Sequence, residues 1–518
     1  MRSTQRWIAV CAATAGILAL AACTPSKGSS GGGTRGGSTG SSGGTSDTLT
    51  VAIDTPPDDW NPADASPADP NLLYYQAPYD FLINTDSTGK LVPGLATSWV
   101  STPTSLTLTL RSGVKFTDGT PFDATAVKVN IENQQKNGLP PNKGVFANVT
   151  GIDVVSPTVV RLDLAKPTPQ LPNNLARQQG IMASPKAIQD DPNGLKTDPV
   201  GTGGWILDTK ATVPNSKYVF HANPNYWNKS AIGFQNIVIE YIPDDQARTN
   251  ALLTHQVQWI NYGTQQGSQI QSAGFQTLQT PEFPYYLEIL DRDGKMIPAL
   301  KNPLVRQAMS YAIDRATFVK VTLAGQGSAT TQWTIPGQPG YNASYTGMTY
   351  DLAKAKALMK QAGVSGFSVT IPSYGPFDTY NEAIAGFLAQ IGITVKLQTV
   401  QTGNVSGAAA SGKYAMAIVP SHAVTPNDFY GTYVSTHGSQ NPNGIASPDV
   451  DALMAKINGD ASHDEPIYQQ MSEQVSNDAY VIPVAVINAG AGWDGSKLTG
   501  VTGWLWTEDV RFAGLRSK

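Results

Sequence analysis

The sequence lacks cysteine after residue 23. Both of its cysteines, Cys11 and Cys23, lie near the N-terminus of the 518-residue chain. Residues beyond Cys23 therefore cannot form a disulfide with one another or a thiolate site for a metal ion. The five histidines are also spread too widely for an H-E-x-x-H zinc site, because no two of them lie within one helical turn. We predict no bound metal.

Charged residues are scarce, and there is no excess of basic ones. They make up 14% of the chain, and its formal net charge is -4. A protein that binds nucleic acid through phosphate contacts needs a basic surface, which this composition does not supply. We predict no nucleic-acid partner.

Catalytic and cofactor-binding motifs are also missing. The sequence contains no P-loop and no G-x-G-x-x-G motif. Two G-x-S-x-G matches, at Gly36 to Gly40 and Gly40 to Gly44, lie in a Gly/Ser-rich run without the flanking strand and helix that a nucleophile elbow needs. We predict that the protein is not an enzyme and binds no cofactor.

The N-terminus has the pattern of an exported lipoprotein. Arg2 and Arg6 precede an apolar stretch from Trp7 to Leu20, as in a signal peptide. The residues Leu20-Ala21-Ala22-Cys23 resemble a bacterial lipobox, which predicts a signal peptide over residues 1–22 and lipidation of Cys23. The alternative is an ordinary signal peptide with an incidental cysteine. Residues 23–46 are rich in Gly, Ser and Thr and predict a flexible tether to the outer face of the cell membrane.

The remaining chain is too long for one hydrophobic core, and we expect two or three domains. Its clearest pattern lies between Leu91 and Glu132, where leucines alternate with polar residues as in a half-buried strand. The alternating leucines are Leu106, Leu108 and Leu110. Asp123 then occupies the N-cap position of a predicted helix, although alternation in the residues after it also fits a strand.

Other segments have equally simple patterns. Short apolar runs predict strands at 49–53, 237–242, 367–371 and 393–400, with two more between 154 and 164. Helical spacing predicts helices at 244–256, from 303, at 352–362 and at 380–390. The prolines between 166 and 199 predict an irregular segment with one short helix. The order strand, helix, strand over 367–400 predicts a parallel βαβ unit.

Several short motifs follow one another in the stretch that begins at Leu91. They are Pro93-Gly94-Leu95-Ala96, Ser98-Trp99, Leu110-Arg111, Gly113-Val114-Lys115-Phe116, Asp118-Gly119, Pro121, Ala124 and Val127. In this order they resemble the signature of the family 5 extracellular solute-binding proteins of ABC transporters, the dipeptide-, oligopeptide- and nickel-binding lipoproteins. Further blocks that resemble the same family are 199–205, 223–227, 242–253 and 306–315, with Gly204-Trp205 in place of the more usual Pro-Tyr.

The resemblance implies an α/β, bilobal periplasmic-binding-protein-like fold of type II (cluster C), with an extra small domain and a two-crossing hinge. Lobe I would comprise residues 47–83, 197–277 and 488–518, the extra domain II residues 84–196, and lobe III residues 278–487. The solute would bind in the cleft between the lobes.

The resemblance also implies which residues bind the solute. Peptide-binding relatives pair the peptide's α-ammonium with an aspartate at a position that aligns here with His422, beside Ser421, and Asp428 is a possible substitute. Because a neutral histidine cannot neutralise an ammonium, this departure weakens the case for peptides with a free N-terminus. His422 could equally be a surface residue. The other predicted ligand-binding residues are Asp64, Tyr286, Trp333 and Tyr374.

We therefore expect a monomeric, lipid-anchored binding protein that delivers a small solute, short peptides first, to the permease of an ABC importer. Oligosaccharides, opines, metal chelates and haem are the alternative solutes. A structural lipoprotein or a cell-wall hydrolase on the same fold is the alternative of a different class.

Overall fold

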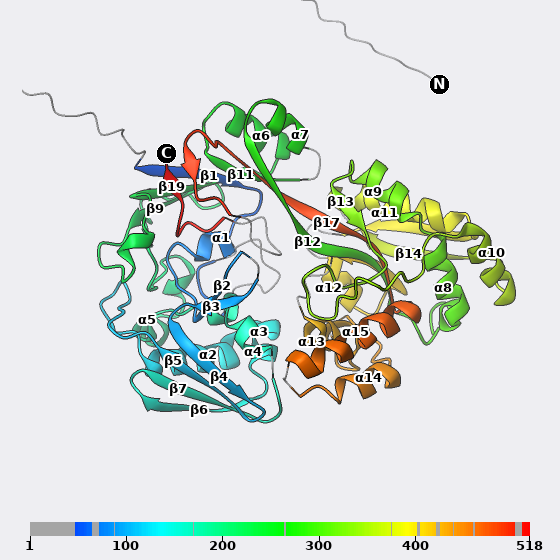
Figure 1. Cartoon of the computed structure of the whole chain (residues 1–518), viewed down its shortest axis with the longest axis horizontal. Coiled ribbons are helices and arrows are strands. Elements are labelled where there is room, and N and C mark those ends of the chain that lie inside the picture. The colour runs from blue at the N-terminus through cyan, green and yellow to red at the C-terminus, as the bar shows by residue number, and fades with distance from the viewer. Residues whose placement is uncertain are drawn as a thin grey trace, which may run out of the picture. The chain divides into compact units, whose positions relative to one another are not determined.

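The computed structural model describes residues 47–57, 59–64, 72–87, 89–168, 170–263, 266–373, 375–400, 405–420, 425–438, 440–458, 461–502 and 510–518 (Figure 1). Residues 45–518 form one compact unit. Within the described ranges, no helix combines the length and the hydrophobicity needed to cross a membrane.

A nine-stranded mixed sheet connects distant parts of the sequence (Figure 1). Its order is β16-β12-β17-β11-β1-β10-β9-β8, with β13 also paired to β17. The strand β1 is parallel to both β10 and β11, whereas the other pairs are antiparallel. The bounds are β1 Thr48–Ile53, β8 Trp205–Leu207, β9 Lys217–Ala222, β10 Asn236–Tyr241, β11 Trp259–Tyr262, β12 Gln276–Ile289, β13 Gly327–Ala329, β16 Met416–Pro420 and β17 Val481–Trp493.

The two long strands β12 and β17 pair with each other over almost their whole length. Their register shifts between Pro281 and Phe283 and again between Tyr285 and Tyr286. Beyond these shifts β12 pairs with β16, while the opposite end of β17 pairs with β11. A register shift marks a bulge, where a strand bends and changes its twist. The strands therefore bend between the segment that meets β11 and the segment that meets β16.

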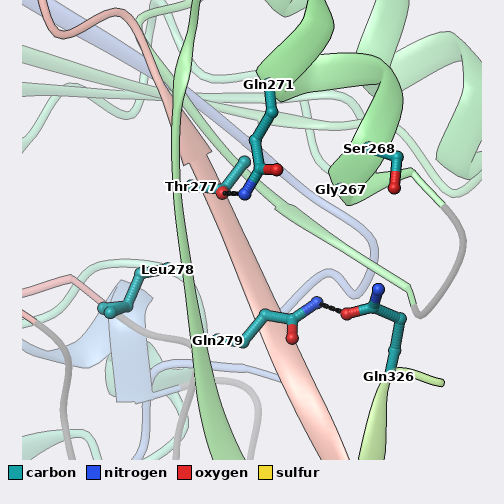
Figure 2. A pocket seen from close by; sticks show the side chains of 7 residues that line it. All are labelled: Gly267, Ser268, Gln271, Thr277, Leu278, Gln279 and Gln326. Carbon is teal, nitrogen blue, oxygen red and sulfur yellow. Dashed lines mark hydrogen bonds between the residues drawn. The ribbon is translucent and has the colours of Figure 1, made fainter.

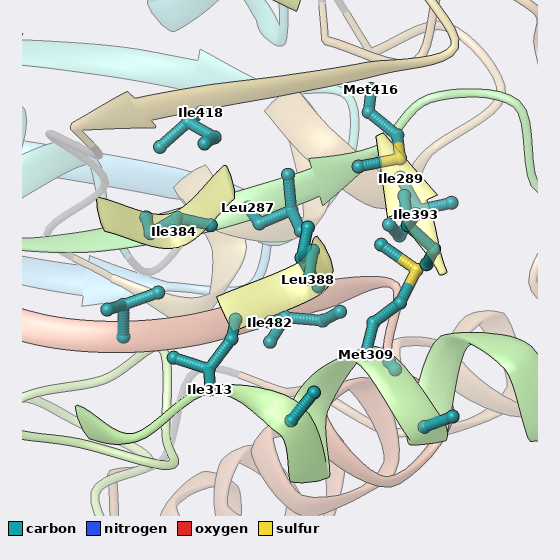
Figure 3. Packing of buried hydrophobic residues seen from close by; sticks show 14 of the residues in the cluster. Leu287, Ile289, Met309, Ile313, Ile384, Leu388, Ile393, Met416, Ile418 and Ile482 are labelled. Carbon is teal, nitrogen blue, oxygen red and sulfur yellow. The ribbon is translucent and has the colours of Figure 1, made fainter. Parts of the chain in front are cut away.

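A large hydrophobic cluster surrounds the second half of β12 (Figure 3). Leu287 and Ile289 of β12 and Ile482 of β17 pack there against helices that lie between these two strands in the sequence. Its other labelled members are Met309, Ile313, Ile384, Leu388, Ile393, Met416 and Ile418. The helices and strands around it are α8 Pro303–Ala312, α9 Arg315–Thr322, α10 Leu352–Gln361, α11 Gly375–Ala389, β14 Phe367–Ser373 and β15 Ile393–Thr399.

Two further clusters involve the earlier part of the chain. One packs β1 and β10 with aromatic residues of α1 Leu72–Tyr75 and with the C-terminal segment around Phe512. The other fills one face of a four-stranded antiparallel sheet of order β4-β5-β7-β6 and includes residues of the helix α2. The bounds are α2 Ala124–Asn137, β4 Ala96–Thr102, β5 Ser105–Leu110, β6 Val149–Ser156 and β7 Val159–Leu164.

The remaining helices and small sheets are short. The helices are α3 Pro140–Val145, α4 Leu171–Asn174, α5 Pro185–Asp190, α6 Asp245–Leu253, α7 Gly267–Ser272, α12 Val405–Ala410, α13 Pro426–Phe429, α14 Pro448–Met454 and α15 Ala461–Asn477. Helical turns of other types are η1 Gln178–Gly180, η2 Gly194–Lys196, η3 Lys229–Ala231, η4 Pro298–Lys301 and the π-helical η5 Tyr430–Val434. The strands β2 Ile83–Thr85 and β3 Leu91–Pro93 pair with each other, as do β18 Leu498–Thr499 and β19 Arg516–Ser517.

Most of the local sequence predictions are confirmed. Asp123 caps α2 by accepting a hydrogen bond from the amide of Ala126 at 3.0 Å. The strands β14 and β15 are parallel, as the βαβ pattern predicts. The prediction of a single short helix between 166 and 199 is wrong, because α4, η1, α5 and η2 all lie there. Pro172 and Pro185 occupy the first turns of α4 and α5, where a proline starts a helix rather than breaking it. The predicted division into lobes stays a prediction.

The motifs of the sequence signature meet around the half-buried carboxylate of Asp80. It accepts hydrogen bonds of 2.9 Å each from Thr202 Oγ1, Tyr226 Oη and Trp227 Nε1. The guanidinium of Arg111 lies 4.2 Å from the centre of the Trp227 ring and also donates to the carbonyl of Gly94. Burial raises the pKa of Asp80, and the three hydrogen bonds and the Arg111 charge offset part of that rise. These motif residues therefore connect separate segments of the fold through Asp80 and the ring of Trp227.

Candidate functional site

Four aromatic rings from three segments pack together in the second half of the chain. Trp333 stacks on Phe429 with ring centroids 3.9 Å apart, and Phe429 contacts Tyr433 at 4.9 Å. Tyr286, on β12, meets Phe429 and Tyr433 edge-on at 6.2 and 5.7 Å. We call Tyr286, Trp333, Phe429 and Tyr433 the aromatic site. The structure thus brings together Tyr286 and Trp333, which were both predicted from the sequence to bind the solute.

Local sequence explains how α13 and η5 present two of these rings. Thr425 caps α13 by accepting a hydrogen bond from the amide of Asp428, and Pro426 follows it in the first turn. The helix then continues as the π-helical turn η5, a conformation that is frequent at functional sites. Phe429 and Tyr433 therefore lie four positions, about one helical turn, apart on this continuous helical segment, and both are buried.

The indole nitrogen of Trp333 is buried and has no hydrogen-bond acceptor among the described residues. Its side chain is only 1% exposed. A buried donor without a partner costs about 1–3 kcal/mol, so such groups are usually satisfied by a water molecule or a ligand. The aromatic site therefore contains a directed polar group as well as apolar ring faces.

Asp428 directly precedes Phe429 of the aromatic site in the sequence. Its Oδ2 accepts a hydrogen bond of 2.8 Å from Thr425 Oγ1. Desolvation raises the pKa of Asp428, while the bonds from Thr425 and the positive charge of Arg177 oppose that rise. The carboxylate is therefore incompletely compensated, and a cationic group of a solute would stabilise its ionised form.

Arg177 was not predicted from the sequence. It lies directly before η1, between α4 and α5, and its charge reaches Asp428 from a segment about 250 positions earlier in the sequence. Gln178 follows it, and both polar atoms of the Gln178 side-chain amide are buried without a partner among the described residues. Arg177 lies in a proline-rich loop and has no periodic signal, so only the three-dimensional structure could reveal it. Phe429 and Tyr433 follow the predicted ligand-binding residue Asp428 in the sequence, but the spacing of the two aromatic residues was not used in the prediction.

The other predicted residues lie elsewhere or outside the description. Asp64 forms an ion pair with Lys196 Nζ at 3.0 Å and accepts a hydrogen bond from Asn61 Nδ2 at 3.2 Å. Within the described residues its contacts are thus made with its own neighbourhood and not with the aromatic site. Cys23, Tyr374, Ser421 and His422 lie outside the described residues.

A second buried polar group lies on the same strand as Tyr286. Glu288 is 2% exposed, and neither of its carboxyl oxygens has a hydrogen-bond partner among the described residues. Burial raises its pKa well above the usual value, and the charge of Arg292 opposes the rise. The Arg292 guanidinium lies 4.9 Å from the centre of the Tyr480 ring, and burial lowers its pKa to about 10. The charge of Arg292 thus acts on the carboxyl group of Glu288 although the contacts of the described residues include no direct ion pair between them.

This chain is similar to a known protein family and to several solved structures. Residues 90–443 match the family model described as "Bacterial extracellular solute-binding proteins, family 5 Middle". The glutathione-binding protein GsiB of Escherichia coli O1:K1 is 31% identical over 339 residues, and that of Salmonella typhimurium is 30% identical over 341. The alignment covers 63% of this chain and 64% of each of these relatives, so it spans somewhat under two thirds of their length.

Solved structures show the same fold at lower identity. The periplasmic binding protein DppA of Helicobacter pylori in complex with the peptide STSA has a TM-score of 0.79 and is 23% identical, covering 91% of this chain and 98% of that chain. The protein NikA of Brucella suis in complex with Fe(III)-EDTA also has a TM-score of 0.79. It is 22% identical, and the match covers 91% of this chain and 100% of that chain. The fold is therefore the mixed α/β, bilobal one of these binding proteins.

Proposed function

The chain belongs to the bacterial extracellular solute-binding proteins of family 5, and from that premise we propose that it captures short peptides for an ABC importer. The observation that carries the choice of peptides is the incompletely compensated carboxylate of Asp428, in the residue directly before Phe429 of the aromatic site. A peptide supplies an ammonium for the carboxylate, apolar side chains for the ring faces and carbonyl groups for the indole N–H of Trp333.

The names of similar proteins support the same solute class. The curated relatives are named as glutathione-binding proteins, and glutathione is a tripeptide derivative with a free ammonium. One structural neighbour holds the peptide STSA and another, from Pseudoalteromonas, holds Met-Leu. Because one structural neighbour binds Fe(III)-EDTA and another binds agropinic acid, metal chelates and opines are the alternative solutes.

Delivery would follow from hinge closure, which accords with the long strands β12 and β17. In this proposal the residues 278–487 form one lobe, the residues 47–83, 197–277 and 488–518 form the other, and the solute stabilises the closed form that the permease recognises. Family members are extracytoplasmic, and the motif at Leu20-Ala21-Ala22-Cys23 supports anchoring of this chain to the membrane by a lipidated Cys23.

The role of Asp428 is tested with a thermodynamic cycle. The affinities of the wild-type protein and of Asp428→Asn are measured by calorimetry for a panel of di- to tetrapeptides, glutathione among them, and for their N-acetylated forms. If Asp428 pairs with the ammonium, the substitution weakens binding of the free peptides by about tenfold or more and leaves binding of the acetylated forms nearly unchanged. Asp190→Asn, at an exposed position, is the matched control.

Two results would contradict the proposal. One is equal binding of free and acetylated peptides, which would remove the role of Asp428. The other is the absence of any peptide binding together with binding of oligosaccharides, opines or chelates, which would replace peptides by that solute class.

A further inference from the structure

A small pocket that shares no lining residue with the aromatic site opens where β12 begins (Figure 2). Its volume is about 240 Å³. The walls come from α7, from the first residues of β12 and from the turn before β13. The polar residues that line it are Ser268, Gln271, Thr277, Gln279 and Gln326.

The walls of this pocket pack into different hydrophobic clusters. Ile270 of α7 packs in a small cluster with Leu252 and Tyr262. Gln326 follows α9, whose Phe318 and neighbouring Leu323 belong to the large cluster around the second half of β12. The pocket therefore lies between residues of two different hydrophobic clusters, within the one compact unit that residues 45–518 form.

The turn that presents Gln326 has an unusual backbone. Ala324 and Gly325 both have positive φ values, 50° and 81°, and the amide of Gln326 donates to the carbonyl of Leu323 at 2.7 Å. An alanine in the left-handed region costs about 1–2 kcal/mol. Gly327 then allows the chain to approach β17, because a Cβ there would lie 2.6 Å from the carbonyl oxygen of Val486. The surrounding structure therefore fixes the position of Gln326 in spite of the strain.

Tyr262 adjoins residues that line the pocket. Its side chain is 4% exposed, and a Cβ on Gly267 would lie 2.9 Å from the Tyr262 hydroxyl oxygen. Its ring occupies the space beside Gly490, where a Cβ would come within 2.3 Å of it. The hydroxyl has no hydrogen-bond partner among the described residues. Burial raises the pKa of Tyr262, and the proximity of Gln279 and Thr277 offsets part of the rise. A buried hydroxyl therefore adjoins three lining residues, Gly267, Thr277 and Gln279.

The lining residues keep part of their hydrogen-bonding capacity. Gln271 Nε2 donates to Thr277 Oγ1 at 2.6 Å, and Gln279 Nε2 donates to Gln326 Oε1 (Figure 2). Within the part of the chain that the structure describes, no further hydrogen bond engages the amide oxygens of Gln271 and Gln279 or the amide nitrogen of Gln326, so these atoms can bind water or a ligand. None of the seven lining residues is charged or aromatic.

This chemistry selects the ligand class. A charged ligand would lose water without gaining a counter-charge, and a flat apolar ligand would find no aromatic face. The volume lies below the usual range of about 300–1,000 Å³ for drug-sized ligands, so only a small molecule fits. Hydroxyl groups, which both donate and accept, match the mixed set of amide and hydroxyl partners. We propose that the pocket is a second binding site of this protein, for a small uncharged polyhydroxylated molecule such as a sugar alcohol or a single hexose.

The test uses the intact protein with sorbitol and glucose as probes and saturation-transfer NMR as the readout. We expect binding of at least one probe to the wild type, a loss of affinity of about tenfold in Gln326→Ala and in Tyr262→Phe, and no change in Asp428→Asn. Circular dichroism and thermal melting verify that each variant is folded, and Tyr262→Phe keeps the ring that fills the space beside Gly490.

Three outcomes would overturn the proposal. The first is that neither probe binds, and the second is that both pocket variants bind like the wild type. The third is that Asp428→Asn alone abolishes probe binding, which would move the sugar to the solute site. The test is independent of the peptide proposal, because a protein that binds no peptide can still show probe binding that depends on Gln326 and Tyr262.

Discussion

Glu288 combines complete burial with the lack of a hydrogen-bond partner among the described residues. Its pKa in the folded chain is raised well above the usual value of 4.5, chiefly by desolvation. A glutamate whose pKa is raised by folding keeps its proton in the native state over a pH range in which the unfolded chain has already lost it. Its contribution to stability is therefore fully present below pH 4.5 and is lost as the pH rises toward the folded pKa.

We expect Glu288→Gln to remove this dependence. Within that pH range, the free energy of unfolding of the wild type should fall by about 1.4 kcal/mol per pH unit more than that of the variant. Urea unfolding at pH 5, 6, 7 and 8, with Glu382→Gln as an exposed control, measures the difference. Parallel stability curves for the wild type and Glu288→Gln would show that Glu288 is ionised in the native state.

Individual residues show where sequence reasoning stops. The arginines of the later sequence blocks match the family pattern, but nothing in the pattern shows what they contact. In the structure Arg248, Arg306 and Arg315 are all buried and donate to backbone carbonyls, for example Arg315 Nε to Pro483 at 2.7 Å. These contacts join residues up to 172 positions apart. A local motif carries no information about a partner so distant, so the structural role could not be predicted.

The secondary-structure elements were predicted best where the local signal is strong. Asp244 and Asp351 cap α6 and α10 by accepting bonds from the amides three residues later, as the sequence suggests. The strand β17 was not predicted, since its second half contains Ala and Gly residues rather than the β-branched and aromatic residues typical of strands. Pairing with β12 and β11 compensates for this weak propensity, and such pairing is not visible in the local sequence.

Asp80 connects loops that carry the signature motifs through its hydrogen bonds, and one substitution removes these bonds. Asp80→Ala leaves buried Thr202, buried Tyr226 and half-buried Trp227 without their common acceptor. We expect a loss of about 3 kcal/mol or more in the free energy of unfolding, and a smaller loss in Asp80→Asn, which keeps an acceptor oxygen. Urea unfolding followed by tryptophan fluorescence measures both.

The surface substitution Asp190→Ala serves as the control for Asp80, because Asp190 is exposed and pairs only with Lys186 among the described contacts. Its effect should stay within about 0.5 kcal/mol. If Asp80→Ala unfolds at the same urea concentration as the wild type, the hydrogen bonds of the carboxylate do not stabilise the fold and the motifs must have another role.

At the scale of the whole molecule, the fold was predictable from the order of motifs, but the solute site was predictable only in part. Tyr286 and Trp333 meet in space, whereas Asp64 is engaged with Lys196. The positive charge that acts on Asp428 comes from Arg177, in the segment predicted as the extra domain. Two chain segments far apart in the sequence thus share one electrostatic site, and its properties depend on how they approach.

This coupling gives a test across the molecule. Arg177 lowers the pKa of Asp428, so removing its charge should raise that pKa further. An ammonium-bearing peptide needs the ionised carboxylate, and its affinity falls as the pH drops through the pKa of Asp428. In Arg177→Ala the fall should therefore begin at a higher pH than in the wild type, while Arg177→Lys, which keeps the charge, should follow the wild type more closely. Carbon-13 NMR of the Asp428 carboxyl group gives the pKa directly, without any peptide. Identical titration curves in Arg177→Ala and the wild type would show that the two segments do not share a site, whatever solute the protein carries.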